Sequence, residues 1–386
     1  MFLGYDRHDG SAGIRNHVII LSTVVCANGV AQMVERMVPG TVAVTHNVGC
    51  DRLGDGPSHT KVLTNLGCNG NVFAAVVIGL GCEEIDSCRV ANLIAATGRP
   101  VAHFVVQQCG GSVPTAEKAA RAAREFLAAA ERMERVPMDD SRLIVGLECG
   151  GSDAMSGITA NPVMGLVSDR IVAAGGTVIL TEIDEMVGTE EVLRRQLVSE
   201  ELGCQLTELI QDTYHRRSGF FHIYNGRGLS VGTLEGGVTT IQEQSLGCIK
   251  KGGSTPILQL LDYGQVPDEH GLVIMDGPGQ DTDSMAGLVA SGAQMILFST
   301  GRGTPAGVPI ASVVKIASNS RIYGAQRCDF DFNANGSEGD GSLGDPKLLA
   351  SRLHGLVLET ACGRETAAER NLQNGFMTIW CKNFTV

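Results

Sequence analysis

Cysteines stand where several predicted strands end, and their chemistry is the first question that the sequence raises. The five positions are Cys26, Cys50, Cys82, Cys109 and Cys149, in "TVVCANG", "THNVGCDRLGDG", "GLGCEE", "QQCGGS" and "LECGGSD". A single cysteine at a strand end is usually a packing residue, but five at equivalent ends favour metal binding. The chain has no CxxC pair, so a structural zinc site is not indicated. Single cysteines on separate loops suit a labile iron–sulfur cluster or an open Fe2+ site.

The remaining cysteines have no comparable setting. The N-terminus "MFLGYDRHDGSAGIRN" has no apolar run after a basic start, so no signal peptide is indicated and we expect a cytoplasmic protein. Thiols stay reduced in that compartment, and the 12 cysteines are therefore not a disulfide framework. We interpret as packing residues Cys68, Cys88, Cys204, Cys248, Cys328, Cys362 and Cys381.

Two glycine-rich segments combine backbone N–H groups, hydroxyls and cations. They are "NGRGLSVGTLEGGVTTIQEQSLGCIKKGG" (225–253) and "DGPGQDTDSMAGLVASGAQMILFSTGRGTPAG" (276–307). Their cations are Arg227, Lys250, Lys251 and Arg302. This mixture suits a carboxylate ligand, because guanidinium groups and helix N-termini both favour it. Neither segment contains GxxxxGK[ST] or GxGxxG, so nucleotide binding is not indicated.

The hydrophobic pattern predicts the elements that must position these residues. Strands are expected at 17–23, 41–47, 72–80 and 100–106, with helices at 28–38, 58–67, 85–98 and 115–136, the last capped by Thr115. After a break at "PMDDS" (137–141), strands are expected at 142–148, 176–181, 271–276, 294–299 and 309–316, with a helix from about Asn161. Such alternation is typical of parallel sheets covered by helices. We therefore predict an α/β fold of two Rossmann-like parallel-sheet domains, 1–137 and 138–386, with the active site in the cleft at the C-terminal ends of the strands.

Composition bounds the class of partner. The chain has 386 residues, of which 43% are hydrophobic, enough to fill two cores. Its net charge of −12 argues against nucleic acid and anionic membranes, because both favour basic surfaces. No stretch reaches the roughly 18 apolar residues that a membrane span needs. A small acidic substrate and a homo-oligomeric assembly are expected instead.

These segments resemble the altronate dehydratase/galactarate dehydratase family. The resemblance rests on "GYDRHDGSAGIRNHVIILSTVVCAN", "VAVTHNVGCDRLGDG", "AAVVIGLGCEE", "LIVGLECGGSDAMSGITANP", "EGGVTTIQEQSLG" and "DGPGQDTDSMAGLVASGAQMILFSTGRGTPAG". It implies an iron-dependent hydro-lyase acting on a sugar acid or small hydroxy acid, with Cys26, Cys50, Cys82 and Cys149 as iron ligands. It leaves Cys109 out, because a non-cysteine is expected there.

The chain departs from that pattern in ways that bear on substrate and partner. Single-chain members carry a small β-rich domain before this region, so a separate small β-rich subunit is expected here. Members acting on sugar acids resemble "PGN…GG" followed by "EKSLG", whereas this chain has Thr233 and Gln244 in "VGTLEGG" and "EQSLG". The two-subunit arrangement is similar to that of sulfolactate sulfo-lyases. Release of sulfite and pyruvate from (2R)-sulfolactate is therefore the alternative to dehydration to a 2-keto acid.

The expected reaction removes an α-proton and expels a β-substituent, which requires a base and a group that holds the carboxylate. His46 is the first candidate for the base and Lys315 the second. Arg302 is expected to hold the substrate carboxylate, and Glu148 to orient the metal or substrate. The residues expected to bind substrate are Asp153, Ser299, Thr300, Lys250 and Thr233. An alternative of another class is a thiol-rich metal or redox protein without lyase activity.

Overall fold

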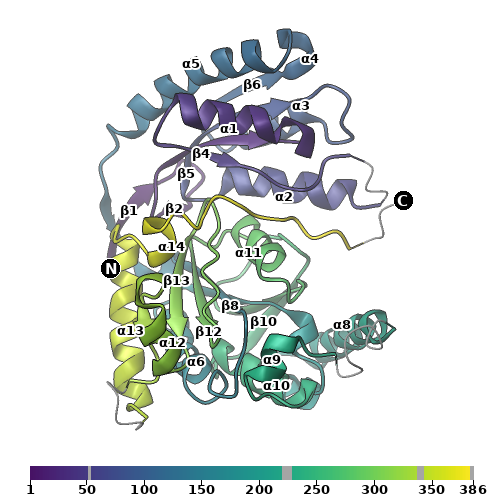
Figure 1. Cartoon of the computed structure of the whole chain (residues 1–386), viewed down its shortest axis with the longest axis vertical. Coiled ribbons are helices and arrows are strands. Elements are labelled where there is room, and N and C mark those ends of the chain that lie inside the picture. Colours follow the sequence, from purple (N-terminus) through teal and green to yellow (C-terminus); the bar gives the residue numbers. More distant parts are fainter. Residues whose placement is uncertain (51–53, 220–227, 337–342, 383–386) are drawn as a thin grey trace.

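The computed structural model describes residues 1–50, 54–219, 228–336 and 343–382. Its first unit is built on a four-stranded parallel sheet in the order β4-β3-β5-β6 (Figure 1). The central strand β3 reads "HVIILS" and is buried almost throughout, as expected for a parallel strand covered on both faces. The strands are β3 (His17–Ser22), β4 (Thr41–Val44), β5 (Val72–Gly79) and β6 (Val101–Val105).

Helices cover both faces of this sheet because successive strand residues point to opposite sides. Ile20 packs with α1 and α5, whereas Ile19 and Leu21 pack with α2 and α3. Thr115 does not cap the long helix as predicted. It lies inside α5, and its hydroxyl donates to the carbonyl of Gly111, which is the N-cap. The helices are η1 (Val25–Ala27), α1 (Asn28–Met37), α2 (Gly56–Cys68), α3 (Ser87–Ala95), α4 (Val106–Cys109) and α5 (Ser112–Ala130).

The second unit is built on a seven-stranded parallel sheet in the order β10-β11-β9-β8-β12-β13-β14. The mixed α/β class with parallel sheets is thus confirmed. The five strands predicted in this part are present, whereas β10 and β14 were not predicted. The strands are β8 (Ile144–Cys149), β9 (Thr177–Leu180), β10 (Ile257–Leu261), β11 (Leu272–Met275), β12 (Met295–Thr300), β13 (Ser312–Ala317) and β14 (Phe332–Asn333).

The helices of the second unit include a group that follows β9 and precedes β10. This group, with α8, α9 and α10, projects beside the sheet on the side where β8 ends (Figure 1). The helices are η2 (Asp140–Arg142), α6 (Ala160–Ala173), η3 (Ile183–Glu185), α7 (Glu190–Arg194), α8 (Glu200–Ser218), α9 (Val231–Glu235), α10 (Ile241–Cys248), η4 (Ile249–Gly252), α11 (Asp281–Ala290), α12 (Ser320–Ala325), η5 (Arg327–Asp329), α13 (Pro346–Ala361) and α14 (Ala367–Arg370).

A small antiparallel sheet occupies the segment where the sequence pattern breaks. β1 (Phe2–Asp6) pairs with β2 (Ala12–Gly13) on one side and with β7 (Val136–Met138) on the other. The N-terminus thereby lies beside the connection between the two units (Figure 1). None of the described helices is long and apolar enough to cross a lipid bilayer.

One hydrophobic core joins the two units. Leu63 and Leu66 of α2 belong to the same buried cluster as Met285 and Leu288 of α11, and α2 lies between the four-stranded sheet and α11 (Figure 1). An interface of this apolar kind restricts relative motion of the units.

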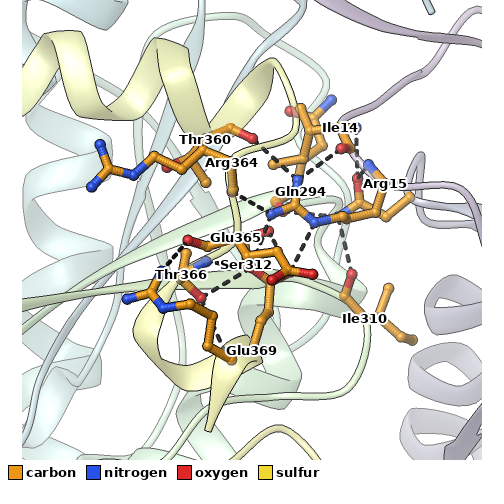
Figure 2. Close-up of polar contacts among 12 residues, drawn as sticks. Ile14, Arg15, Gln294, Ile310, Ser312, Thr360, Arg364, Glu365, Thr366 and Glu369 are labelled. Atoms are coloured by element: carbon orange, nitrogen blue, oxygen red, sulfur yellow. Dashed lines mark hydrogen bonds and ion pairs between the residues drawn. The ribbon is translucent and has the colours of Figure 1, made fainter. Parts of the chain in front are cut away.

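A buried polar junction adds to that core (Figure 2). The Arg15 guanidinium binds the Glu369 carboxylate through two hydrogen bonds of 2.8 and 2.9 Å. It also donates to the carbonyls of Ile14, Thr360 and Arg364. Burial opposes ionisation of Glu369, but the hydrogen bonds and charge of Arg15 outweigh it and lower the pKa of that carboxyl. The junction therefore ties the start of the first unit to the end of the second.

Candidate active site

A group of two thiols and a carboxylate lies at the C-terminal end of β8, the central strand of the seven-stranded sheet. The Cys149 Sγ atom is 3.2 Å from the Sγ of Cys248 and 3.2 Å from Oε2 of Glu185, and Cys248 Sγ is 2.6 Å from the same oxygen. All three ligand atoms lie within 4.8 Å of one another. Throughout the described ranges, no other group of three or more His, Cys, Asp or Glu side chains has this spacing. We call it the Cys149–Glu185–Cys248 group.

A buried ion pair lies directly behind this group. The Lys251 ammonium contacts the Glu182 carboxylate, and both side chains are 1% exposed. Lys251 Nζ also donates to Cys149 Sγ at 3.0 Å, and the Cys149 amide donates to Glu182 Oε1 at 3.4 Å. Glu182 has a φ of 69°, a left-handed conformation that is costly for a residue other than glycine. Strain of this kind concentrates at functional sites.

Mutual electrostatics set the protonation of these side chains. The hydrogen bond from Cys248 and the charge of Lys251 hold the pKa of Cys149 well below its ordinary value, although burial opposes them. Burial lowers the pKa of Lys251, but the Cys149 thiolate and Glu182 outweigh it and leave that pKa well above the ordinary value. Burial and the Cys149 thiolate raise the pKa of Glu185. These shifts favour a Cys149 thiolate beside the Lys251 ammonium and the protonated forms of Glu185 and Cys248. Burial and the charge of Cys149 also raise the pKa of Glu182, to about 8.

A cavity of about 220 Å³ opens onto this group. Every residue of its lining falls between Cys149 and Asp281, so the second unit forms the cavity by itself, at the C-terminal ends of its strands. The Gln244 amide, which is part of the lining, donates to Glu185 Oε1 at 2.6 Å. Other polar side chains of the lining are Asp184, Tyr214, Arg217, Ser230, Thr233 and Asp281.

Asp281 is the acidic lining residue that begins α11. Burial raises the pKa of its carboxyl, and the charge of Lys315 opposes this effect. Lys315 lies on β13, outside the cavity lining, and its side chain is fully buried. Its Nζ donates to the Ala306 carbonyl at 2.7 Å and lies 3.2 Å from the centre of the Phe298 ring, and burial lowers its pKa to about 7. Lys315, one of the two predicted bases, therefore influences the cavity only through its effect on the pKa of Asp281.

His46, the other predicted base, lies in the first unit after β4. Its Nε2 is 2.7 Å from the Ser22 carbonyl, and its Nδ1 accepts from the Val48 amide at 3.2 Å. Burial lowers the pKa of His46 to about 4. Both ring nitrogens are used by the backbone, so the structure gives this histidine a role in fixing the loop and does not bring it to the cavity.

Glu148 and Arg302, predicted to orient and hold the substrate, also lie outside the cavity lining. Glu148 is fully buried and accepts from the Ser284 hydroxyl. Burial and the neighbouring Glu182 raise its pKa. Arg302 lies in a separate depression, where its guanidinium binds the Glu235 carboxylate at 2.7 Å on the surface.

Of the predicted substrate-binding residues, Thr233 lies in the cavity lining. Lys250 is exposed in a neighbouring depression. Asp153 organises a loop by accepting from Ser156, Ser318 and Asn319. The Ser299 hydroxyl donates to Asn161, and the Thr300 hydroxyl accepts from the amides of the turn that follows it. The cation Arg227 lies outside the described residues.

The four predicted iron ligands do not form one group. Cys149 belongs to the Cys149–Glu185–Cys248 group, whereas Cys26, Cys50 and Cys82 are exposed at the edge of the four-stranded sheet. The three last residues are not members of any ligand group with single-ion spacing in the part of the chain that the structure describes.

Sequence reasoning missed the partners of Cys149. Cys248 was interpreted as packing, and Lys250 was preferred to its neighbour Lys251. Glu182, Glu185 and Asp281 were not considered. A signal for the acidic residues was available, because they follow the strands predicted at 176–181 and 271–276. The strand-end argument that selected Cys149 applies equally to carboxylates.

Comparison with known proteins identifies similar chains. Residues 4–131 match the family described as D-galactarate dehydratase/Altronate hydrolase, second domain, and residues 140–384 match D-galactarate/Altronate dehydratase, C-terminal. An altronate dehydratase of Bacillus subtilis is 35% identical over 96% of this chain and 76% of that protein. A (2R)-sulfolactate sulfo-lyase subunit beta of Chromohalobacter salexigens is 34% identical over 95% of this chain and 94% of that subunit. A galactarate dehydratase (L-threo-forming) of Escherichia coli is 30% identical over 94% of this chain and 73% of that enzyme.

Proposed function

The chain belongs to the D-galactarate/altronate dehydratase family and is a lyase, and from this premise we propose that it catalyses an iron-dependent β-elimination from a small hydroxy acid or sugar acid. The observation that carries the proposal is the Cys149–Glu185–Cys248 group at the end of a cavity of about 220 Å³. The product is a 2-keto acid, because loss of an α-proton and a β-substituent leaves an enol that tautomerises.

The Cys149–Glu185–Cys248 group fits a ferrous ion. Two sulfurs and one carboxylate oxygen form a mixed donor set that suits iron or zinc, and three protein ligands leave coordination positions open. A bound ferrous ion would supply Lewis-acid stabilisation of the negative charge that develops on the substrate carboxylate. Lys251 places a positive charge at 3.0 Å from Cys149 Sγ and so offsets part of the negative charge of the ligands. Gln244 orients Glu185 through its 2.6 Å hydrogen bond.

Asp281 is the residue that we assign as the base. It lies in the cavity lining, and a carboxylate with a raised pKa accepts a proton more readily at neutral pH. One Asp281 carboxylate oxygen takes the α-proton. Lys315 lies outside the cavity lining, and its charge stabilises the ionised form of Asp281. It therefore acts as a positioning residue.

The substrate's acid group requires a cation in the cavity. Arg217 on α8 lies in the lining together with Tyr214, and its guanidinium contacts Asp184. We assign substrate recognition to these side chains. Thr233 extends the polar lining through its hydroxyl, which is 2.8 Å from the Ser230 hydroxyl.

Release of sulfite is the second candidate reaction, and Gln244 favours it. A lysine is expected at this position in sugar-acid dehydratases. Gln244 places a neutral amide beside Glu185 instead, so the positive charge of that lysine is absent next to the Cys149–Glu185–Cys248 group. The relative from Chromohalobacter salexigens, a sulfo-lyase subunit, is matched over 94% of its length. By analogy we propose a separate small subunit as partner, a homo-oligomer of the resulting pair, and a division of this chain into domains 1–137 and 138–386.

Anaerobic assays of two variants test this proposal. The purified chain, loaded with ferrous iron, is tested for 2-keto acid and for sulfite on sugar acids, small hydroxy acids and sulfolactate, alone and with a candidate small β-rich subunit. Asp281→Asn should lower turnover by roughly 10²–10⁴-fold while iron content is unchanged. Cys248→Ser should lose iron and turnover together. Full turnover by Asp281→Asn would show that Asp281 is not the base, and full turnover by iron-free protein would refute the metal-dependent reaction.

A further inference from the structure

A segment near the end of the described residues belongs to neither unit alone. Residues 377–382, which we call the C-terminal strap, form no helix or strand and run between α2 of the first unit and α11 of the second (Figure 1). Met377 and Ile379 are fully buried in the hydrophobic core that the two units share. The strap is therefore part of the interface between the units, and its other contacts show what it holds.

Backbone groups of the strap are bound by the first unit. The Ile379 amide donates to Asn47 Oδ1 at 2.8 Å, and the Asn47 side-chain amide donates back to the Ile379 carbonyl at 3.3 Å. The Trp380 carbonyl lies 3.3 Å from Nε2 of His59. Asn47 follows β4 and His59 lies on α2, so the four-stranded unit fixes the position of the strap.

Two strap side chains contact the second unit, at the connection between β11 and α11. The Thr378 hydroxyl lies 2.6 Å from the hydroxyl of Thr282. Lys382 Nζ donates to Asp276 Oδ2 at 2.6 Å, and the Asp276 side chain is 11% exposed. Asp276 directly follows β11, and Thr282 lies in the first turn of α11. The two contacts therefore hold the connection at both of its ends.

Trp380 adds a third contact through a tyrosine. Its amide donates to the Tyr263 hydroxyl at 3.3 Å, and that hydroxyl donates to the Asp283 carbonyl. The rings of Trp380 and Tyr263 pack edge to face, with their centroids 5.5 Å apart. Asp283 is the third residue of α11, so this contact also fixes the first turn of that helix.

The first turn of α11 carries the proposed base. Asp281 directly precedes Thr282, and Gly279 of the same connection also lines the cavity. A Cβ atom on Gly150 would lie 2.3 Å from Asp281 Oδ2, so the carboxylate lies against the loop that follows Cys149. A displacement of about 1 Å at a reacting group costs roughly 100-fold in rate. Contacts that fix the start of α11 therefore bear on the reaction.

We infer that Thr378, Trp380 and Lys382 are positioning residues, which hold the start of α11 and thereby keep Asp281 in its place in the cavity lining. The inference rests on the proposed function, in which Asp281 takes the α-proton. The three strap residues lie outside the lining of that cavity, so they act through the connection between β11 and α11. Because Asn47 anchors the strap, the first unit thereby contributes to a site that the second unit forms.

Hydrogen exchange of the full chain, measured by mass spectrometry without substrate, tests whether the strap holds this connection. Thr378→Val and Lys382→Met remove the two side-chain contacts. In the double variant, peptides covering residues 276–283 should exchange at least about threefold faster, because opening of this segment costs less free energy. Phe376→Ser alters an exposed side chain just before the strap and should exchange as the wild type does. Unchanged exchange in the double variant would overturn the inference.

Steady-state kinetics of the iron-loaded chain tests whether this hold serves the reaction. The substrate is an acid, among the sugar acids, hydroxy acids and sulfolactate, that the wild type converts. The double variant should lower kcat by at least about tenfold and change KM by less than about twofold, because a displaced base impairs proton removal and leaves the substrate-binding groups in place. Thr378→Ser retains a hydroxyl and should keep at least about half of the wild-type kcat. Circular dichroism confirms that the variants are folded.

The outcomes separate this inference from the proposed function. Loss of turnover in Asp281→Asn together with full turnover in the double variant would overturn the inference and leave the proposed function intact. A raised KM with unchanged kcat in the double variant would also overturn it, because the strap would then serve substrate binding. Absence of turnover by the wild-type chain would refute the proposed function and, with it, a catalytic role for the strap. The exchange measurement would still decide whether the strap holds the connection, because it needs no substrate.

Discussion

At the carboxyl edge of the seven-stranded sheet, Lys251 and Glu182 are paired and almost inaccessible, whereas the same edge of the four-stranded sheet exposes Cys26, Cys50 and Cys82. His46 is a buried titratable group at the second edge, and the backbone fixes it through both ring nitrogens. Equivalent positions in two parallel sheets therefore present buried charge in one case and exposed thiols in the other.

The difference arises from what covers each edge. The chain between β9 and β10 supplies η3, α10 and η4, which carry Glu185, Cys248 and Lys251 over the end of β8. Between β3, β4 and β5 the described helices are η1, α1 and α2, which form the strand-to-strand connections themselves. Covering helices exclude water, and in their absence a side chain at the strand end remains in contact with solvent.

The largest effect is expected at the buried ion pair. Lys251→Met leaves Glu182 buried without its counter-charge, and loss of one partner of a buried pair costs about 3–5 kcal/mol of unfolding free energy. Denaturant unfolding measures the change. Lys250→Met, at the exposed neighbouring lysine, is the control and should be nearly neutral. The double variant Lys251→Met/Glu182→Gln should recover part of the loss, and no recovery would contradict a charge-pairing role.

His46 should make the other edge sensitive to acid. Its folded-state pKa of about 4 lies below the ordinary 6.5, so the unfolded chain binds this proton more readily. The contribution of neutral His46 to stability is complete above about pH 6.5 and is lost as the pH falls to about 4, by roughly 3 kcal/mol in total. Unfolding of the wild type and of His46→Gln is compared across this range. The difference between them should shrink as pH falls, while the exposed His8→Gln control should follow the wild type.

The junction between the two regions should show a smaller effect. Arg15 and Glu369 are 10% and 15% exposed, so Glu369→Gln should lower the unfolding free energy by about 2 kcal/mol, the scale of a hydrogen bond to a charged group. A double-mutant cycle with Arg15→Gln isolates the pairwise part. The surface pair Arg364–Glu359 is the control, because its side chains are 47% and 60% exposed and surface pairs contribute at most about 1 kcal/mol. Equal interaction free energies in the two double-mutant cycles would contradict the claim that burial strengthens the Arg15–Glu369 pair.

The smallest effect is expected at Arg302. Its guanidinium is paired with Glu235 on the surface, outside the cavity lining, so Arg302→Ala should change the KM of the substrate by no more than about twofold. Arg217→Ala should raise KM by at least about tenfold, because it removes a charge-assisted hydrogen bond. The reverse result would place the substrate's acid group in the depression beside Arg302, as the sequence had predicted.

Much of the fold could be predicted because the hydrophobic pattern of a few neighbouring residues is enough to indicate a strand or a helix. The run "HVIILS", with four consecutive apolar residues, forms β3. The two missed strands lack that signal. β10 is only partly buried along its middle, and β14 has two residues. Thr115 failed as a cap because Gly111, with its φ of 108°, ends the preceding turn earlier.

The sequence by itself determined that a cysteine and an acidic residue would stand at the end of β8, because local hydrophobic periodicity fixes where a buried strand stops. Only the tertiary structure decided what those side chains meet. Cys248 and Lys251 reach Cys149 from 99 and 102 residues away, and Glu148 points into the protein while its neighbour Cys149 faces the cavity. Contacts between residues so far apart in the sequence depend on how separate elements pack together and exclude water. Local sequence patterns do not indicate that packing.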